Sequence, residues 1–238
     1  MSFTAAGGIT LNGAVGSGSA PATGAITFTG PVALATGPIA VTTNNAAITF
    51  AGTVNGAEAL SVNAGSGTTT FAAAVGGTTP LTSLTTGASG VTAISGGSIQ
   101  TSGAQSYDDA VTLGAATTLT GVNVQFAGTL NGAYALAVND SGTTAFSGVV
   151  GGIAPLVSIT TDAPGSVDVN TTAITTSGAQ TYHENMTLGA NASFGGLGLT
   201  FGGTVDGNSN LTVNSGSSTS TFTGAVGGVA PLGSGRCV

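Results

Sequence analysis

Charged side chains are almost missing from this chain. One lysine or arginine and eight aspartates and glutamates occur among 238 residues, which makes 4 % charged residues where soluble domains usually carry about 25 %. Lysine, arginine and glutamate normally cover the solvent face of a helix. Glycine, which takes 42 positions, costs a helix about 1 kcal/mol relative to alanine. The sequence therefore predicts almost no α-helix.

Other absences exclude whole classes of function. The net charge is −7 and the only basic side chain is Arg236, whereas a nucleic-acid phosphate backbone needs a basic surface. No apolar run reaches the roughly 18 residues of a membrane span. Cys237 is the only cysteine, so an internal disulfide is impossible. We therefore expect no nucleic acid, no membrane span and no cofactor.

The beginning of the chain lacks the basic and apolar regions of a secretion signal. The first residues already resemble the repeat, so we expect an internal piece of a larger product rather than a cytoplasmic protein. Disorder is not expected, because 41 % of the residues are apolar and a disordered chain lacks the apolar residues that offset the entropy of ordering.

What the chain does contain is a repeat of about 75 residues. Its first motif, Phe-x-Gly-Thr-Val/Leu-Asn/Asp-Gly, starts at Phe50, Phe126 and Phe201. A second, Ser-Gly-Ala-Gln-x-Tyr, ends at Tyr107 and Tyr182, and a third, Val-Gly-Gly-x-x-Pro-Leu, starts at Val75, Val150 and Val226. Such self-similarity indicates a stacked, elongated architecture. We expect one continuous solenoid over residues 1–232, with repeats at about 25–101, 102–176 and 177–232, and an off-pattern tail at 233–238.

The aromatic residues predict how each repeat subdivides. They mostly fall 19 to 22 residues apart, but Tyr107 follows Phe71 and Tyr182 follows Phe146 by 36 residues. An aliphatic residue would replace the aromatic in each gap, near Val91 or Ile94 and near Val167 or Val169. This gives four rungs of about 19 residues per repeat, and three rungs of about 25 residues are the alternative.

Around the aromatic residues, apolar and polar side chains alternate with the period of a half-buried strand, as in Ile48-Thr49-Phe50. Turn residues such as Asn131-Gly132 separate the strands. We therefore predict an all-β fold, a parallel β-helix (β-solenoid), with the aromatic side chains in one internal column. Asn63, Asn139 and Asn214 would form either an inter-rung ladder or simple turns.

These motifs resemble the repeats of large bacterial surface proteins of the filamentous-haemagglutinin and autotransporter-adhesin type. The resemblance covers roughly residues 25 to 232. It implies a parent protein exported across the outer membrane, a right-handed β-helix filament, and a role in adhesion, biofilm or matrix structure. It carries no catalytic residues over to this sequence, and neither a secretion domain nor a translocator barrel is present in it.

Candidate reactive residues are few. His183 and Glu184 could be imagined as metal ligands, but neighbours on a strand point to opposite faces. Asp108 and Asp109 could contribute to a calcium site, which needs six to eight oxygen ligands. A polysaccharide-active β-helix enzyme is a further alternative, although lyases of this shape usually need a basic residue and only Arg236 is available. We expect no catalytic, cofactor-binding or metal residues and no enzymatic activity.

The function expected from the sequence is a structural or adhesive segment of an extracellular bacterial surface or filament protein. Its partners would be further copies of itself, end to end or laterally, together with glycans or a host or matrix surface. Threonine-rich strands also suggest an ice-binding solenoid as the alternative, although a strict Thr-x-Thr in each rung is missing.

Overall fold

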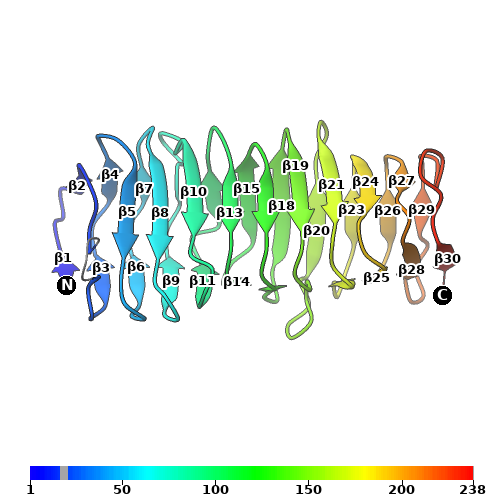
Figure 1. Ribbon diagram of the computed structural model, residues 1–238, viewed down its shortest axis with the longest axis horizontal. Coiled ribbons are helices and arrows are strands. Elements are labelled where there is room, and N and C mark those ends of the chain that lie inside the picture. Colours follow the sequence, from blue (N-terminus) through cyan, green and yellow to red (C-terminus); the bar gives the residue numbers. More distant parts are fainter. Residues whose placement is uncertain (17–20, 238) are drawn as a thin grey trace.

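The chain winds into a rod built only of β-strands. The computed structural model describes residues 1–16 and 21–237, and over these residues it contains strands and no helix (Figure 1). About 11 rungs follow one another, about 21 residues apart. At the strand spacing of about 4.8 Å, this gives a rod on the order of 50 Å long.

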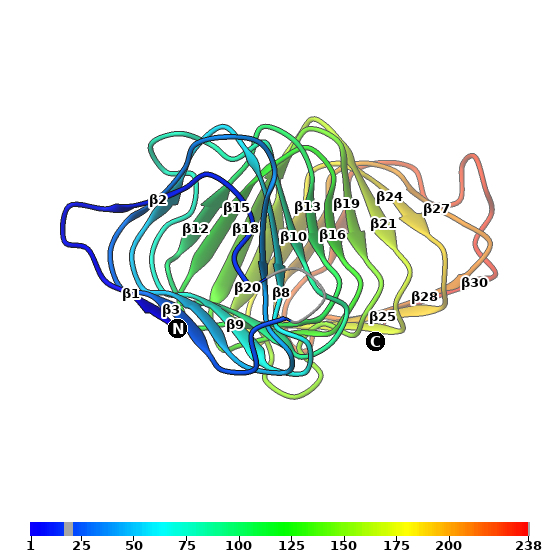
Figure 2. The ribbon, with the colours of Figure 1, turned by 60° about the vertical axis from the view of Figure 1, so that its left-hand side comes forward.

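Each rung contributes strands to three parallel sheets, called faces A, B and C in the order in which the chain visits them. Figure 2 shows the strands of successive rungs lying side by side along the rod. Face A consists of two runs joined through the isolated bridges of Val150 to Leu130 and Ile174. Its strands are β1 (Ser2–Phe3), β3 (Ile26–Phe28), β6 (Ile48–Phe50), β9 (Thr68–Phe71), β11 (Val91–Ile94), β14 (Ala110–Leu113), β17 (Leu130–Asn131), β22 (Ala173–Thr175), β25 (Ala192–Gly195), β28 (Asn210–Asn214) and β30 (Ser234–Cys237).

Face B is likewise continuous through the bridges of Val75 to Val54 and Ile99. Its strands are β2 (Ile9–Leu11), β4 (Val32–Leu34), β7 (Val54–Asn55), β12 (Ser98–Gln100), β15 (Thr117–Gly121), β18 (Ala135–Asp140), β20 (Ser158–Thr161), β23 (Gln180–Tyr182), β26 (Leu199–Phe201) and β29 (Thr221–Phe222).

Face C is one nine-stranded sheet. Its strands are β5 (Ile39–Thr42), β8 (Ala59–Asn63), β10 (Ser83–Thr86), β13 (Gln105–Tyr107), β16 (Val124–Phe126), β19 (Thr143–Phe146), β21 (Ser166–Val169), β24 (Asn185–Leu188) and β27 (Val205–Asp206).

The coil is right-handed. In Figure 1 the front strands, such as β5 and β8, run downward, and the strands behind them, such as β6 and β9, run upward as the chain advances from the N-terminus to the C-terminus. Right-handed connections between parallel strands are the general rule. The all-β, parallel solenoid predicted from the alternating pattern is thus confirmed.

The alternation of apolar and polar residues places one side chain of each pair inside the rod. In β6, Ile48 and Phe50 are fully buried and Thr49 between them faces outward. The apolar residues from all three faces form one continuous core along the rod. Because no strand contributes more than three buried side chains, the core forms by the stacking of side chains from successive rungs and not within any single rung.

Most of the aromatic side chains form three short columns, one on each face. Phe3, Phe28, Phe50 and Phe71 stack on face A, with ring centroids 4.9 to 5.3 Å apart. Tyr107, Phe126 and Phe146 stack on face C at 5.3 and 5.5 Å. Tyr182, Phe201 and Phe222 stack on face B at 5.6 and 4.7 Å. The single internal column predicted from the spacing is therefore wrong.

The reason is that the sequence repeat does not equal a whole number of rungs. From β6 the chain returns to face A at β9, β11 and β14, and then crosses two more faces to reach β16. One repeat is therefore three and two-thirds rungs. Ile94 does follow Phe71 in register, and Val169 follows Phe146, as expected for the gaps. The next tyrosine, however, lies on another face, so neither four rungs of 19 nor three of 25 describes the repeat.

The off-pattern tail also takes part in the fold. Ser234–Cys237 pairs in parallel with Asn210–Val213 of β28, so sheet pairing extends beyond residue 232. All four residues of β30 are exposed. Face A therefore ends in a strand whose outer edge has no neighbour among the described residues.

Candidate functional site

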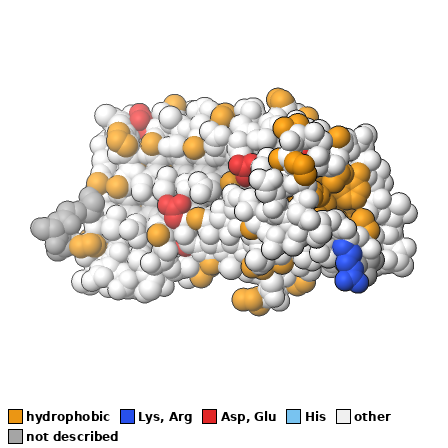
Figure 3. All heavy atoms as spheres, turned by 45° about the vertical axis from the view of Figure 1, so that its right-hand side comes forward, with side chains coloured by type: hydrophobic (Ala, Val, Ile, Leu, Met, Phe, Trp, Pro, Cys, Tyr) orange, Lys and Arg blue, Asp and Glu red, His pale blue; other side chains and the backbone are white. Residues whose placement is uncertain are grey.

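The outer faces carry ladders of hydroxyl side chains. On face B, strand register aligns Thr118, Ala137, Thr160, Thr181, Thr200 and Thr221. On face A, Thr27, Thr49 and Thr70 align in the same way. Figure 3 shows one side of the rod, which is mostly uncharged, with scattered acidic groups and one basic group. The exterior therefore offers hydroxyls, amides and backbone rather than charge.

The Gln and Tyr side chains of the Ser-Gly-Ala-Gln-x-Tyr motif are buried inside the rod, whereas its Ser and Ala are exposed. The Tyr107 hydroxyl donates to Gln105 Oε1 at 2.9 Å, and Gln105 Nε2 donates to the Thr120 carbonyl at 2.8 Å. Tyr182 and Gln180 repeat this arrangement with the Gly195 carbonyl. Burial raises the pKa of both tyrosines. The motif is thus a fully bonded internal network that joins two rungs.

The other two sequence motifs meet each other across neighbouring rungs. Asn131 Oδ1 accepts the backbone N–H groups of Ile153 at 2.9 Å and Ala154 at 3.2 Å. These two residues belong to the loop that begins at Val150. Asn55 and Asp206 cap the equivalent loops of their own repeats in the same way. Sequence reasoning placed these residues in turns and missed the partnership, whose only signal is the constant separation of the two motifs.

Asp206 is the charged member of this set. Its Oδ1 accepts the N–H groups of Val229 at 2.8 Å and Ala230 at 3.2 Å. These hydrogen bonds, that of Val229 first, lower the pKa of the carboxyl of this partly exposed residue. The amide oxygens of Asn55 and Asn131 form the same cap in the first two repeats. The carboxylate of Asp206 therefore has the same structural role as these amides.

The capped loops carry exposed apolar tips in two of the three repeats. Ile153 is 90 % exposed and Val229 is 87 % exposed, whereas Thr78 stands at the same place in the first repeat. Tyr134 and Val157 lie beside the second loop and are also exposed, and the Val157 N–H donates to the Tyr134 carbonyl. The second repeat therefore has the most apolar corner of the three.

Asp109 is the best-satisfied of the acids that the sequence singled out. It is buried, and its carboxylate accepts the hydroxyls of Thr86 at 2.9 Å and Thr92 at 2.9 and 3.0 Å. Burial raises the pKa of this carboxyl, and the two threonine hydrogen bonds oppose the rise. Asp108 is turned outward and accepts the Ser106 hydroxyl instead. The structure therefore does not bring the two carboxylates together as a calcium site would require.

Glu184 occupies the position of Asp109 in the next repeat, but with one partner fewer. Its Oε2 accepts the Thr161 hydroxyl, and its buried Oε1 has no hydrogen-bond partner. The missing donor has a simple cause. Val167 stands in the register position that Thr92 occupies beside Asp109. Burial, with the threonine bond opposing it, raises the pKa of the Glu184 carboxyl.

His183 and Glu184 lie on opposite sides of the strand end. The histidine is exposed, and its Nδ1 lies 2.6 Å from the Thr161 carbonyl oxygen, while Glu184 is buried. Among the described residues, no three His, Cys, Asp or Glu side chains come close enough to hold a metal ion. The carboxylates of Asp109 and Glu184 therefore have hydrogen-bonding roles within the corners of the rod.

Asp140 is the third buried acid, and its oxygens are used by the backbone. It accepts the N–H groups of Asn123 at 2.7 Å, Val124 at 2.8 Å and Gly142 at 2.8 Å, and the Thr144 hydroxyl at 3.2 Å. A carboxylate with this many donors fixes the corner between two rungs. The sequence does not reveal this role, because two of the donors, Asn123 and Val124, lie 17 and 16 residues away in the chain.

The asparagines at 63, 139 and 214 do not form the ladder that was one of the two predictions. They lie on faces C, B and A respectively, so they cannot stack on one another. Asn63 Oδ1 accepts the Gly65 N–H at 2.9 Å and Asn214 Oδ1 accepts the Gly216 N–H at 3.1 Å. The turn interpretation therefore holds for these two.

Comparison of the chain with known protein families, curated proteins and solved structures found no match. The described residues also contain no helix that could cross a membrane. The solenoid and its surface are therefore the features that bear on function.

Proposed function

We propose that this chain is a structural and adhesive segment of an extracellular bacterial surface or filament protein. The observation that carries the proposal is the continuity of three parallel sheets along the whole rod. Every rung is hydrogen-bonded to the next on all three faces, which makes the rod stiff. Its role is mechanical: it acts as a rigid spacer and presents a long polar surface.

The surface chemistry supports association of rods with one another. Charged side chains are one of the devices that keep strand edges of different molecules apart, and this chain has a single basic side chain and eight acids. Parallel strands at both ends of the rod, such as β1 and β30, have one edge unpaired among the described residues. Association end to end uses these edges, and lateral association uses the hydroxyl ladders.

Sedimentation and small-angle scattering over a concentration series test the proposal. We expect particles that grow with concentration, with an unchanged cross-section for end-to-end growth and a wider one for lateral growth. A variant with Thr160, Thr181 and Thr200 changed to glutamate places like charges in one ladder of face B. It should abolish lateral growth and leave end-to-end growth intact. A monodisperse monomer at every concentration would contradict the proposal.

The face B ladder also favours ice binding as a second candidate. Its threonines are aligned in register at about the 4.8 Å spacing of neighbouring strands. However, the next outward position along each strand holds a mixture, with Thr120, Asn139 and His183 among its residues. The threonines of face B therefore form one row along the rod and not a two-dimensional array. A thermal-hysteresis measurement decides this candidate, and no effect at high protein concentration would exclude it.

A further inference from the structure

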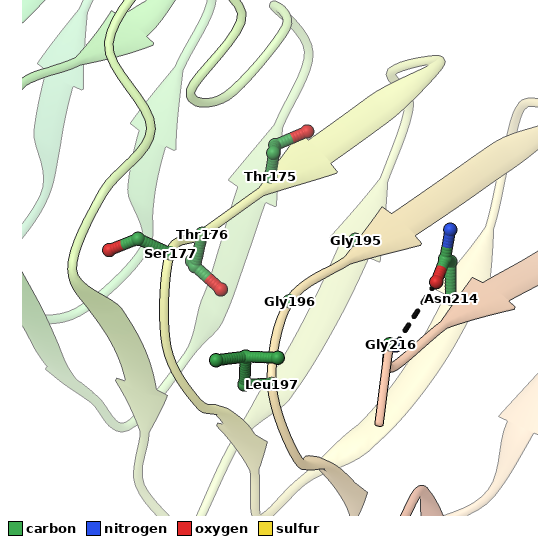
Figure 4. A pocket seen from close by; sticks show the side chains of 8 residues that line it. All are labelled: Thr175, Thr176, Ser177, Gly195, Gly196, Leu197, Asn214 and Gly216. Atoms are coloured by element: carbon green, nitrogen blue, oxygen red, sulfur yellow. Dashed lines mark hydrogen bonds between the residues drawn. The ribbon is translucent and has the colours of Figure 1, made fainter. Parts of the chain in front are cut away.

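A hollow of about 380 Å³ lies on the outside of the third repeat, where face A meets face B (Figure 4). Three neighbouring rungs form it. Its lining residues are Thr175, Thr176, Ser177, Gly195, Gly196, Leu197, Asn214 and Gly216. Figure 4 shows the middle rung passing between the other two with two successive glycines, so its floor carries no side chain there.

The second repeat has the same corner, with a threonine where the third repeat has Gly195. Strand register aligns Gln100, Thr120 and Asn139 there, as it aligns Thr175, Gly195 and Asn214 in the third repeat. The floor of the hollow therefore lacks, at Gly195, the side chain that Thr120 has in the second repeat. Gly216 likewise stands where the second repeat has Ser141.

The fold itself does not require glycine at 195. A Cβ added there would meet only the Thr175 Cγ2 atom, at an ordinary 3.9 Å, and the backbone is not left-handed. Gly196 is different, because a Cβ there would lie 2.6 Å from the Thr176 hydroxyl oxygen and 2.7 Å from the Gly178 carbonyl oxygen. Glycine within a strand weakens it and often marks close approach of a ligand. Gly195 therefore weakens its strand, and the packing around it does not require a glycine.

The lining suits a neutral, hydroxyl-rich molecule. Among the described residues, the Thr175 hydroxyl and Asn214 Nδ2 make no hydrogen bond, since Asn214 uses only its Oδ1, towards Gly216. The half-exposed Leu197 supplies an apolar surface, and no charged side chain lines the hollow. Small-molecule sites combine apolar surface with a few placed polar groups; both kinds of group line this hollow, and its polar side chains outnumber its apolar ones.

A second hollow of about 230 Å³ lies on the same three rungs. Its lining residues are Thr172, Asn191, Ala192, Ser193, Asn210 and Thr212. Both hollows follow β25, so a ligand longer than one ring would run along that strand. Arg236 pairs in register with Thr212 and is thus beside the second hollow rather than the first.

We propose that the third repeat binds a neutral glycan, with one sugar ring in the hollow over Gly195 and its apolar face against Leu197. Thr175 and Asn214 hydrogen-bond to the ring hydroxyls, and the next sugar lies along β25. The inference deepens the adhesive part of the proposed function and rests on it. It assigns that adhesion to one site instead of to the whole polar surface.

Nuclear magnetic resonance titration of the full chain tests this site. The probes are glucose, galactose, N-acetylglucosamine, cellobiose and lactose, with glucuronic acid as the charged comparison. We expect saturable shifts of the Gly195, Gly196 and Gly216 amides with at least one neutral sugar, and dissociation constants in the millimolar range. Absence of saturable shifts with every neutral probe, or a preference for glucuronic acid, would overturn the proposal.

Two variants test whether the sugar binds in the hollow over Gly195. Gly195→Thr fills it with the side chain already present at Thr120, and should weaken binding at least tenfold with an unchanged circular dichroism spectrum. The double variant Gln100→Thr with Thr120→Gly opens the equivalent corner in the second repeat, and should add saturable shifts at Gly121. Undiminished binding by Gly195→Thr contradicts the site. Self-association is scored separately by sedimentation, so a rod that associates but binds no sugar refutes this inference alone.

Discussion

Phe126 and Phe201 occupy the same place in the sequence repeat, yet they lie on different faces of the rod. Phe126 stacks between Tyr107 and Phe146 on face C, and Phe201 stacks between Tyr182 and Phe222 on face B. Each repeat thus advances the pattern by three rungs and two faces. Equivalent motifs therefore point in three directions around the rod, and three repeats restore the starting face.

Replacement of Phe126 by alanine should destabilise the middle of the rod. The ring is buried in a column with neighbours at 5.3 and 5.5 Å, and loss of such a ring typically costs about 3–5 kcal/mol. Phe222 is the matched control, because it is only partly buried at the end of its column. Denaturant unfolding should show a clearly smaller loss for Phe222→Ala. Equal losses would argue against the three-column core.

The two buried carboxylates provide a reciprocal pair of variants. Val167→Thr supplies Glu184 Oε1 with the donor that Thr92 supplies to Asp109, and should stabilise the protein at neutral pH by on the order of 1–2 kcal/mol. Thr92→Val removes a partner from Asp109 and should cost a similar amount. Chemical unfolding at pH 7 measures both. The interpretation fails if the two changes shift stability in the same direction.

The same carboxylates set a dependence of stability on pH. Burial raises the pKa of Glu184 and of Asp109 in the folded protein, so the folded state holds these protons more tightly than the unfolded chain. Their contribution is complete below the ordinary carboxyl pKa and is lost as pH rises through the raised values. Glu184→Gln should therefore reduce the fall in melting temperature between mildly acidic and neutral pH. An identical fall in the variant would show that Glu184 does not titrate in this range.

Loss of the Asn131 cap should loosen a single loop. Asn131→Ala removes the acceptor for the Ile153 and Ala154 N–H groups, at a cost of about 1 kcal/mol for each bond. Hydrogen exchange should accelerate at these two amides, and not at Thr78 and Thr79, which Asn55 caps in the first repeat. Unchanged exchange at Ile153 would mean that the loop is held by other contacts.

Much of the fold could be predicted from local pattern, because alternation and turn residues act within a few positions. Ile48-Thr49-Phe50 forms a strand with the expected faces inside and outside. The face of the rod on which each copy of a motif lies could not be derived from the sequence. It depends on the lengths of the corners between strands, which change by a residue or two. The partners of Glu184 and Asn131 also escaped prediction, because they lie about one rung away, on the neighbouring turn of the coil.

A pair of engineered disulfides tests most directly how the sequence repeat is offset from the rungs of the rod. In a Cys237→Ser background, Thr85→Cys with Ser106→Cys joins outward positions that are register partners on face C. Ala93→Cys with Ser106→Cys joins positions on faces A and C, which a single aromatic column from Phe71 through Ile94 to Tyr107 would bring together. The account predicts that mild oxidation closes the first disulfide and not the second. Closure of the second with failure of the first would contradict it.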